Sequence, residues 1–174
     1  MEKKVDEAWE RFLNPVILRT NLITASIYIA AFEILNESIV GRIRDFFSLS
    51  SDKTYQEDVL SKNRSPVYAS LQWLKEMDAI GDSDILLYDQ AKNCRNAIAH
   101  ELNRMLSDGL PTDWPNHFGD MVSLLDKIEK WWILNVDIPT NPDFAGKTID
   151  ESEIVPGPIL GLRMLLNTAL GSEA

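Results

Sequence analysis

Cysteine and histidine are both scarce in this chain. Its 174 residues include one cysteine, Cys94, and two histidines, His100 and His117. A single cysteine excludes an internal disulfide and a cysteine-based zinc cluster. The sequence also lacks a glycine-rich phosphate loop, a metal-ligand spacing and a serine–histidine–acid arrangement. We therefore expect neither a cofactor nor a metal ion, and the two histidines leave few candidates for acid–base chemistry.

Long apolar runs are missing as well. The longest uninterrupted one extends from Ile27 to Phe32, far short of the roughly 20 apolar residues that span a bilayer. The N-terminus, Met1 to Glu7, carries charges of both signs and no apolar segment follows it, so it does not resemble a secretory signal. We expect no transmembrane helix and no membrane partner, and a cytoplasmic location is the default.

Acidic residues outnumber basic ones. The chain has 27 Asp and Glu against 17 Lys and Arg, a formal net charge of −10. Such a charge opposes non-specific binding to nucleic acid or anionic lipid. Any contact with RNA must therefore be local, which argues against a protein that coats or tracks along RNA. At this length we expect one domain.

The apolar periodicity is helical almost throughout, and we predict an all-α protein. A short amphipathic helix is expected over Val5 to Leu13. Asn14 as cap and Pro15 in the first turn should open a long central helix, which Gly41 bends. Its expected apolar stripe is Leu22, Ile29, Phe32, Ile39, Ile43 and Phe46.

Further helices are predicted along the rest of the chain. Residues Ser48 to Asn63 are polar and predict a connection with a short helical turn around Tyr55 to Leu60. Ser65 and Pro66 should begin a second helix that buries Val67, Leu71, Leu74 and Met77 and stops at Gly81. Asp82 or Ser83 should cap the third helix, and a fourth is expected from Pro115 to Val136.

The C-terminal part should differ from this bundle. Asp137 to Pro158 contains four prolines and two glycines, which predict an irregular excursion. Ile159 to Leu170 should form a last helix that packs back. We therefore expect about four main helices over residues 15–136, with an extension over residues 137–174.

The third helix carries the sequence Arg95-Asn96-Ala97-Ile98-Ala99-His100. Arginine is a permanent planar cation that binds phosphate oxygens, and histidine exchanges a proton near neutral pH. At about 100° per residue, Arg95 lies roughly 60° from the centre of the helix's apolar stripe, while Asn96 and His100 lie roughly 160° from it. The core stripe is expected to contain Leu87, Ala91, Cys94, Ile98, Leu102 and Met105.

Lys92, Asn96, His100 and Arg104 are spaced four apart, so they should form one ridge on the third helix. Arg95 lies beside its first two members. Such a ridge would concentrate positive charge on an otherwise acidic protein. A lone histidine on the polar side of a helix is more often a solvated surface residue, and a Lys/Arg ridge is more often a solubilising face.

The order and spacing of Arg95, Asn96 and His100, with small apolar residues between them, resemble the signature of the HEPN superfamily (higher eukaryotes and prokaryotes nucleotide-binding domains). The resemblance covers about Pro15 to Val136. It implies a helical bundle and a metal-independent RNA endonuclease, in a toxin, antiphage or stress context. It also implies that an acidic residue on an early helix holds the motif arginine, and Glu33 is the best candidate.

In the chemistry that this resemblance implies, Arg95 binds the scissile phosphate and stabilises its charge, and His100 is the general acid or base. Asn96 orients the phosphate or the histidine. Lys92 and Arg104 are supporting residues. One familiar version of the motif has a tyrosine two residues after the histidine, where this chain has Leu102, so regulation through such a tyrosine is in doubt.

The resemblance also implies partners. RNA is the expected substrate. An antitoxin or regulatory protein is expected as a further partner, and the chain is expected to form a homodimer. Two copies of the ridge facing each other would create the concave site that one convex helix lacks.

Two other interpretations remain open. One is a non-catalytic HEPN-like module that binds nucleotide, RNA or a protein, and the other is a plain helical interaction domain in which the motif is coincidental. His117 is expected at the surface and Cys94 in the core. Trp131 and Trp132 should give one ring to the core and one to an interface.

Overall fold

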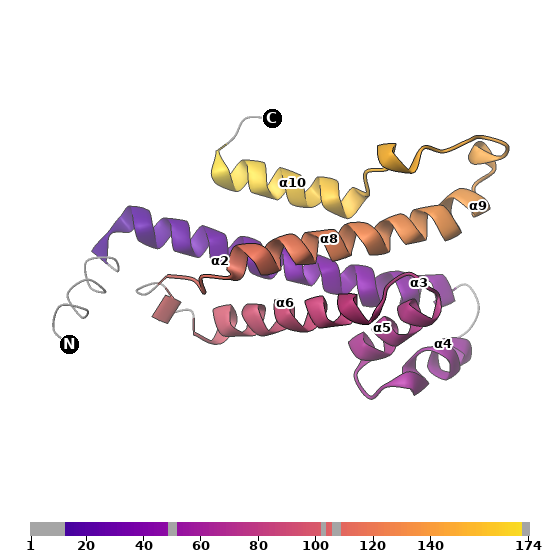
Figure 1. Cartoon of the computed structure of the whole chain (residues 1–174), viewed down its shortest axis with the longest axis horizontal. Helices are drawn as coiled ribbons and strands as arrows, with labels where there is room; N and C mark the ends of the chain where they lie inside the picture. The colour runs from indigo at the N-terminus through magenta and orange to yellow at the C-terminus, as the bar shows by residue number, and fades with distance from the viewer. Residues whose placement is uncertain (1–12, 49–51, 102–103, 106–108, 172–174) are drawn as a thin grey trace.

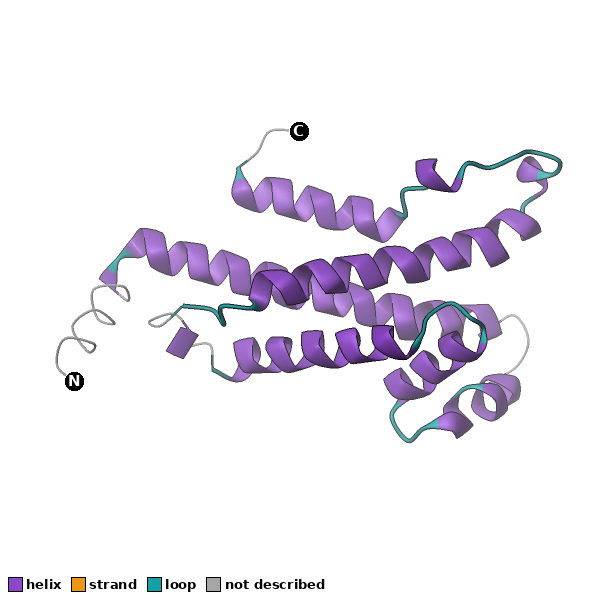
Figure 2. Ribbon diagram, viewed as in Figure 1, coloured by secondary structure: helices purple, strands orange, loops and turns teal. Residues whose placement is uncertain are grey.

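The chain folds into a helical bundle. The computed structural model describes residues 13–48, 52–101, 104–105 and 109–171. Within these ranges every regular element is an α, 3₁₀ or π helix and none is a strand (Figure 2), which confirms the all-α prediction. The helix predicted over Val5 to Leu13 lies outside the described residues, apart from Leu13 itself.

The central helix begins as predicted. α2 (Pro15–Asn36) follows Asn14, whose Oδ1 accepts hydrogen bonds from the backbone N–H groups of Val16 at 3.0 Å and Ile17 at 3.4 Å. The helix continues through a π-helical turn, η1 (Glu37–Gly41), into α3 (Arg42–Ser48). Gly41, where we predicted a bend, is the last residue of this π turn.

The apolar stripe of this helix is shorter than predicted. Phe32, Ile39 and Ile43 are buried, but Leu22 and Phe46 are each 40% exposed. The first turns of α2 extend past the ends of α6 (Asp82–His100) and α8 (Trp114–Trp132) (Figure 1). Phe46 follows the π turn, which changes the phase of the stripe by adding residues per turn.

Residues 15–48 also qualify as a bilayer-spanning helix by length and composition alone, which the count of uninterrupted apolar residues did not anticipate. Buried core helices of soluble proteins and signal sequences pass the same test, and 22% of the apolar window is buried in this fold. The inner side of this stretch, with Tyr28 and Leu35, belongs to the core of the bundle.

The connection after α3 contains α4 (Asp52–Asp58) and η2 (Leu60–Lys62), and α5 (Pro66–Glu76) follows. Two predicted boundaries here are wrong. α5 ends before Gly81, because Asp78 adopts a left-handed conformation with φ 56° that turns the chain. This leaves Met77 43% exposed. The N-cap of α6 is Gly81 rather than Asp82 or Ser83, and its N–H donates to Asp84 Oδ2 at 2.7 Å.

α6 and α8 run antiparallel in front of α2 (Figure 1). α8 passes through a second π turn, η3 (Ile133–Asp137), into α9 (Ile138–Thr140). Aromatic rings occur along the whole core. Tyr28 lies near Phe118 and Phe32 stacks on Tyr88, and at one end Trp73 of α5 stacks on Trp132 with ring centroids 5.9 Å apart.

The C-terminal segment follows the prediction in outline, but the helix before it continues through Thr140 and the last helix begins at Gly157 rather than at Ile159. Residues 141–156 are irregular apart from two short helices, η4 (Pro142–Phe144) and η5 (Glu151–Glu153). α10 (Gly157–Leu170) then packs on α2 and α8, and buries Ile159 and Leu162.

Candidate functional site

An ion pair links the motif to the central helix. Arg95, in the second half of α6, donates from Nη2 to Oε1 of Glu33 on α2 at 2.6 Å. The Arg95 side chain is 31% exposed and that of Glu33 is 52% exposed. The pair that we expected from the resemblance is therefore present, at the edge of the interface between the two helices.

The rest of the Arg95 guanidinium is also positioned. Its centre lies 5.8 Å from the ring of Phe32, and Nη1 is 3.4 Å from Oδ1 of Asn96. Nε is buried and has no hydrogen-bond partner among the described residues. Asn96 is half-buried, although the helical wheel places it roughly 160° from the centre of the apolar stripe. A stacked and paired arginine has a defined orientation, which recognition of phosphate oxygens requires.

His100 is the last residue of α6 and is exposed, as the helical wheel predicted. It follows Asn96 by four residues, so the two side chains lie on one side of the helix about 6 Å apart along its axis. The described part of the chain places no hydrogen bond or ion pair on its ring. His100 is therefore open to solvent or to a ligand.

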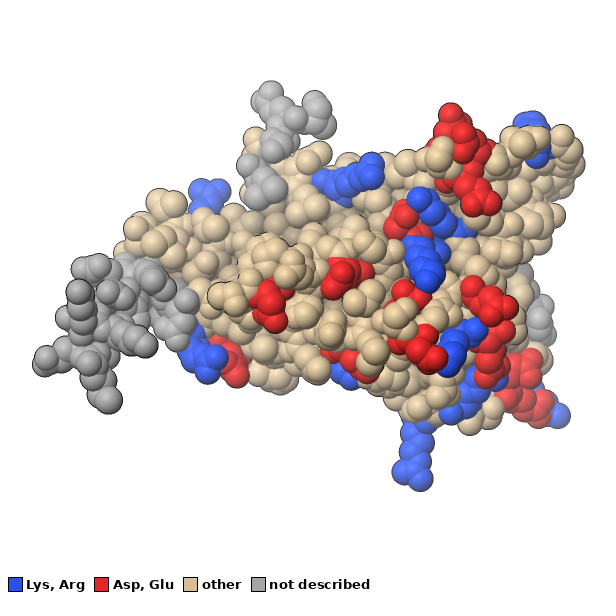
Figure 3. Space-filling model, in the orientation of Figure 1, with Lys and Arg blue, Asp and Glu red and all other residues tan. Residues whose placement is uncertain are grey.

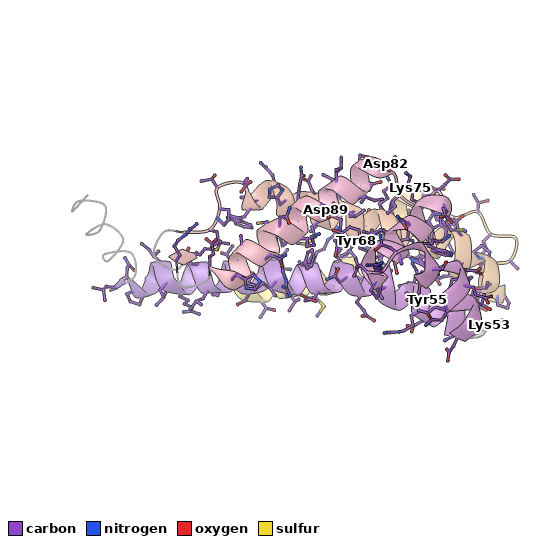
Figure 4. All side chains as sticks on the ribbon, turned by 90° about the horizontal axis from the view of Figure 1, so that it is seen from below. Lys53, Tyr55, Tyr68, Lys75, Asp82 and Asp89 are labelled. Carbon is purple, nitrogen blue, oxygen red and sulfur yellow. The ribbon has the colours of Figure 1, made fainter. Side chains whose placement is uncertain are left out.

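Lys92, one of the predicted supporting residues, belongs to a polar cluster with Tyr68 of α5 and Asp89. The Tyr68 hydroxyl donates to Asp89, and Lys92 Nζ hydrogen-bonds to the Tyr68 hydroxyl and lies 3.1 Å from Asp89 Oδ1. Figure 4 shows Tyr68 and Asp89 close together at the junction of α5 and α6. The hydrogen bond from Tyr68 lowers the pKa of Asp89, and the bond to Tyr68 raises the pKa of Lys92.

The predicted ridge does not continue to Arg104. α6 ends at His100, where Glu101 takes φ −112° and ψ 22°, so Arg104 is not on the same helix as Lys92 and Asn96. Arg104 Nη2 instead pairs with Glu101 Oε2 at 2.7 Å. Leu102, expected on the core stripe, lies outside the described residues.

The positive charge of this surface is also weaker than predicted. Lys92, Arg95 and Arg104 each contact a carboxylate, from Asp89, Glu33 and Glu101 respectively. Figure 3 shows basic side chains next to acidic ones elsewhere as well, gathered at the end of the molecule that carries α3, α4 and α5. An RNA phosphate would therefore have to compete with, or share, an existing carboxylate partner.

The remaining candidates have other partners or are buried. His117, in the first turn of α8, is half-buried and sits 3.0 Å from Asp113 Oδ2. Cys94 is buried, and that burial raises the pKa of its thiol, as suits a core residue. Trp132 is buried and Trp131 half-buried.

Tyr68 is the polar neighbour that the sequence did not indicate. It precedes Lys92 by 24 residues on another helix, and no local pattern connects the two. The described residues contain no group of three or more His, Cys, Asp or Glu side chains arranged to hold a metal ion. Comparison of the chain with protein-family models, with curated proteins and with solved structures finds no match.

Proposed function

We propose that the chain is a metal-independent RNA endonuclease of HEPN type, with Arg95, Asn96 and His100 as its catalytic residues. The observation that carries the proposal is the position of Arg95, paired with Glu33 and 5.8 Å from the ring centre of Phe32, on the same helix as the exposed His100 five residues later. Glu33 serves as a positioning residue for Arg95.

In this mechanism the ribose 2′-hydroxyl attacks the adjacent phosphate, and the 5′-oxygen of the next nucleotide leaves. Arg95 binds the non-bridging oxygens and stabilises the charge that develops on them. His100 takes the proton of the 2′-hydroxyl or gives one to the leaving oxygen. Asn96 orients the phosphate or the ring of His100. The nucleophile belongs to the substrate, so the chain needs to supply only charge and proton transfer.

Cleavage of a labelled single-stranded RNA by the full chain tests the proposal, with His100→Ala as the critical variant. His117→Ala is the matched control, since it removes the chain's other histidine. We expect His100→Ala to lower the rate by at least about a hundredfold, a usual contribution of general acid–base catalysis, and His117→Ala to keep it. Equal cleavage by wild type and His100→Ala would show that the activity does not use this site.

A second candidate function is a non-catalytic helical module that binds a nucleotide, an RNA or a protein. The carboxylate partners of Lys92, Arg95 and Arg104 favour it, because they reduce the attraction of this surface for RNA. A binding measurement with the same labelled RNA, beside the cleavage assay, separates the two functions: RNA binding without any cleavage would favour the module.

A further inference from the structure

A long apolar groove lies on the side of α2 that does not carry Glu33. It has a volume of about 1190 Å³ and runs between α2 and α10. Ile27, Ala30 and Ile34 form its α2 wall, and Pro158, Met164 and Leu165 form its α10 wall. From Ser26 to Ser38 the α2 wall spans about 18 Å at 1.5 Å per residue, which is the length of about three helical turns.

The α10 wall of this groove is exposed although it is apolar, whereas Ile27, Ala30 and Ile34 of the α2 wall are half-buried. Met164 is 70% exposed and Leu165 is 47% exposed. Contiguous apolar side chains open to water mark surfaces that bind another molecule. Methionine adapts its shape to a partner, and such surfaces are typical of grooves that accept an amphipathic helix.

One end of the groove is acidic. Glu37, Asp45, Glu129 and Asp137 line it together with Arg42. Arg44 pairs with Glu37 at 3.4 Å and with Asp45 at 3.8 Å, so four carboxylates against two guanidinium groups give this end a net charge of −2. Arg42 already pairs with Asp137 at 2.8 Å. This end therefore attracts a cation and repels an anion.

Glu129 shows that this acidic end is incompletely paired. Its residue is only 4% exposed, yet its ion pair with Arg42 Nε is 3.7 Å long, beyond hydrogen-bond distance. That Nε has no hydrogen-bond partner among the described residues. Buried charges usually have close partners, so a cation that reaches Glu129 would complete the pairing of this carboxylate, whereas the Nε of Arg42 would need an acceptor.

Both π-helical turns of the described chain border the same end. Glu37 and Ser38 of η1 and Ile133 and Asp137 of η3 line the groove. π turns are uncommon and occur frequently at functional sites. The two central helices are thus distorted where the groove becomes acidic.

We propose that this groove binds an amphipathic helix of a partner protein, with its apolar stripe on Ile27, Ala30, Ile34, Met164 and Leu165 and its basic end at Glu129 and Asp137. The length of the groove suits three turns of helix, and its charge selects a basic end. A membrane fits less well, because an acidic rim is repelled by an anionic lipid surface. This docking site lies apart from Arg95 and His100 and does not depend on the proposed function.

Binding of a designed peptide to the full chain tests the proposal. The probe is a fluorescently labelled helical peptide of about four turns, with leucine and methionine on one face and three lysines at one end. A control peptide carries glutamates in place of those lysines. Fluorescence anisotropy should show binding of the basic peptide, and at least about tenfold weaker binding of the acidic one, because like charges then meet at the groove's end.

Two variants locate the binding. Met164→Asp, at an exposed wall position, should weaken the basic peptide at least about tenfold. Leu86→Asp is the matched control, because Leu86 is 63% exposed on α6 outside the groove, and it should leave binding unchanged. Asp45→Asn should reduce the preference for the basic peptide, whereas Asp58→Asn, on α4, should not.

Several outcomes would overturn the proposal. They are equal binding of the two peptides, equal effects of Met164→Asp and Leu86→Asp, and no binding of either peptide. Cosedimentation of the chain with lipid vesicles but not with the peptide would assign the apolar face to a membrane. A dimer that Met164→Asp alone dissociates would assign the groove to a second copy of the chain.

Discussion

Arg95 Nη2 and Glu33 Oε1, 2.6 Å apart, connect α6 to α2 across 62 residues of sequence. The contact fixes the guanidinium at the helix interface while leaving part of it accessible. Exposed ion pairs contribute only about 0.2–1 kcal/mol to folding. The pair is therefore better explained by the orientation of Arg95 than by stability.

Glu33→Gln tests that explanation. The variant keeps a hydrogen-bond acceptor but removes the charge that holds the guanidinium, so we expect cleavage to fall about tenfold or more. The free energy of unfolding should change by less than about 1 kcal/mol. Glu37→Gln, which breaks the exposed pair with Arg44 one turn later on the same continuous helix, is the control. A large loss of stability with unchanged cleavage would make Glu33 a structural residue.

Arg95→Lys separates the charge of the arginine from its shape. Lysine keeps the positive charge but cannot present two parallel N–H groups to a phosphate. Single-turnover cleavage should therefore be nearly as slow as in Arg95→Ala. Wild-type rates in Arg95→Lys would contradict a two-point contact between this residue and the scissile phosphate.

The reaction should not need a metal ion. We expect cleavage to persist in excess EDTA and the 5′ products to end in 2′,3′-cyclic phosphate, because the nucleophile is the internal 2′-hydroxyl. Mass spectrometry of the products gives the end group directly. Activity that vanishes with chelator and returns with magnesium would instead indicate metal-assisted hydrolysis.

Much of the bundle was predictable because local signals dominate helices. Asn14 and Pro15 open α2 as predicted, and Ile159 begins the buried side of α10. The boundary between α5 and α6 was not predictable, because the left-handed residue there is Asp78 and not a glycine, which would have indicated a turn. The π turns were also missed, since apolar periodicity assumes 3.6 residues per turn throughout.

The candidate site divides in the same way. Exposure of His100 and partial burial of Arg95 follow from the spacing of residues within one helix. Glu33 was chosen for its resemblance to a known arrangement. Tyr68 could not be found, because its contact with Lys92 depends on how α5 packs on α6. The weak positive charge of this surface was not predicted either. Lys92 and Arg95 are paired with carboxylates through contacts between helices or across a helical turn.

Because of Asp84, the free energy of unfolding should depend on pH in the acidic range. Burial alone would raise the pKa of this carboxyl, but hydrogen bonds from Lys127, at 2.5 Å, and from the Gly81 N–H outweigh it and lower the pKa. A lowered folded-state pKa contributes stability above the ordinary aspartate pKa of about 4, and this contribution is lost as the pH falls through the folded value.

Asp84→Asn should therefore lower the free energy of unfolding by about 1–3 kcal/mol at neutral pH. The difference in this free energy between the variant and the wild type should shrink as the pH falls below about 4. Urea unfolding across that range measures both effects. Asp82→Asn is the control, since Asp82 lies in the same turn and its pair with Lys75 is exposed. A difference that stays constant with pH would mean that the ionised carboxylate is not what stabilises the junction of α6 and α8.

The chain should form a homodimer through the exposed side of α6. His100 faces away from the core of its own protomer, and a convex helix offers a substrate neither a cleft nor shielding from water. A two-fold axis beside α6 would place two copies of Arg95, Asn96 and His100 on opposite walls of one groove. Light scattering at micromolar concentration should therefore give twice the mass of the chain.

Ala99→Glu, at an exposed position next to His100, should weaken this dimer by placing like charges across the axis. Met164→Asp, on the α10 groove, should leave the dimer intact. A monomer at micromolar concentration, or a dimer that Ala99→Glu does not affect, would contradict a site shared between two protomers.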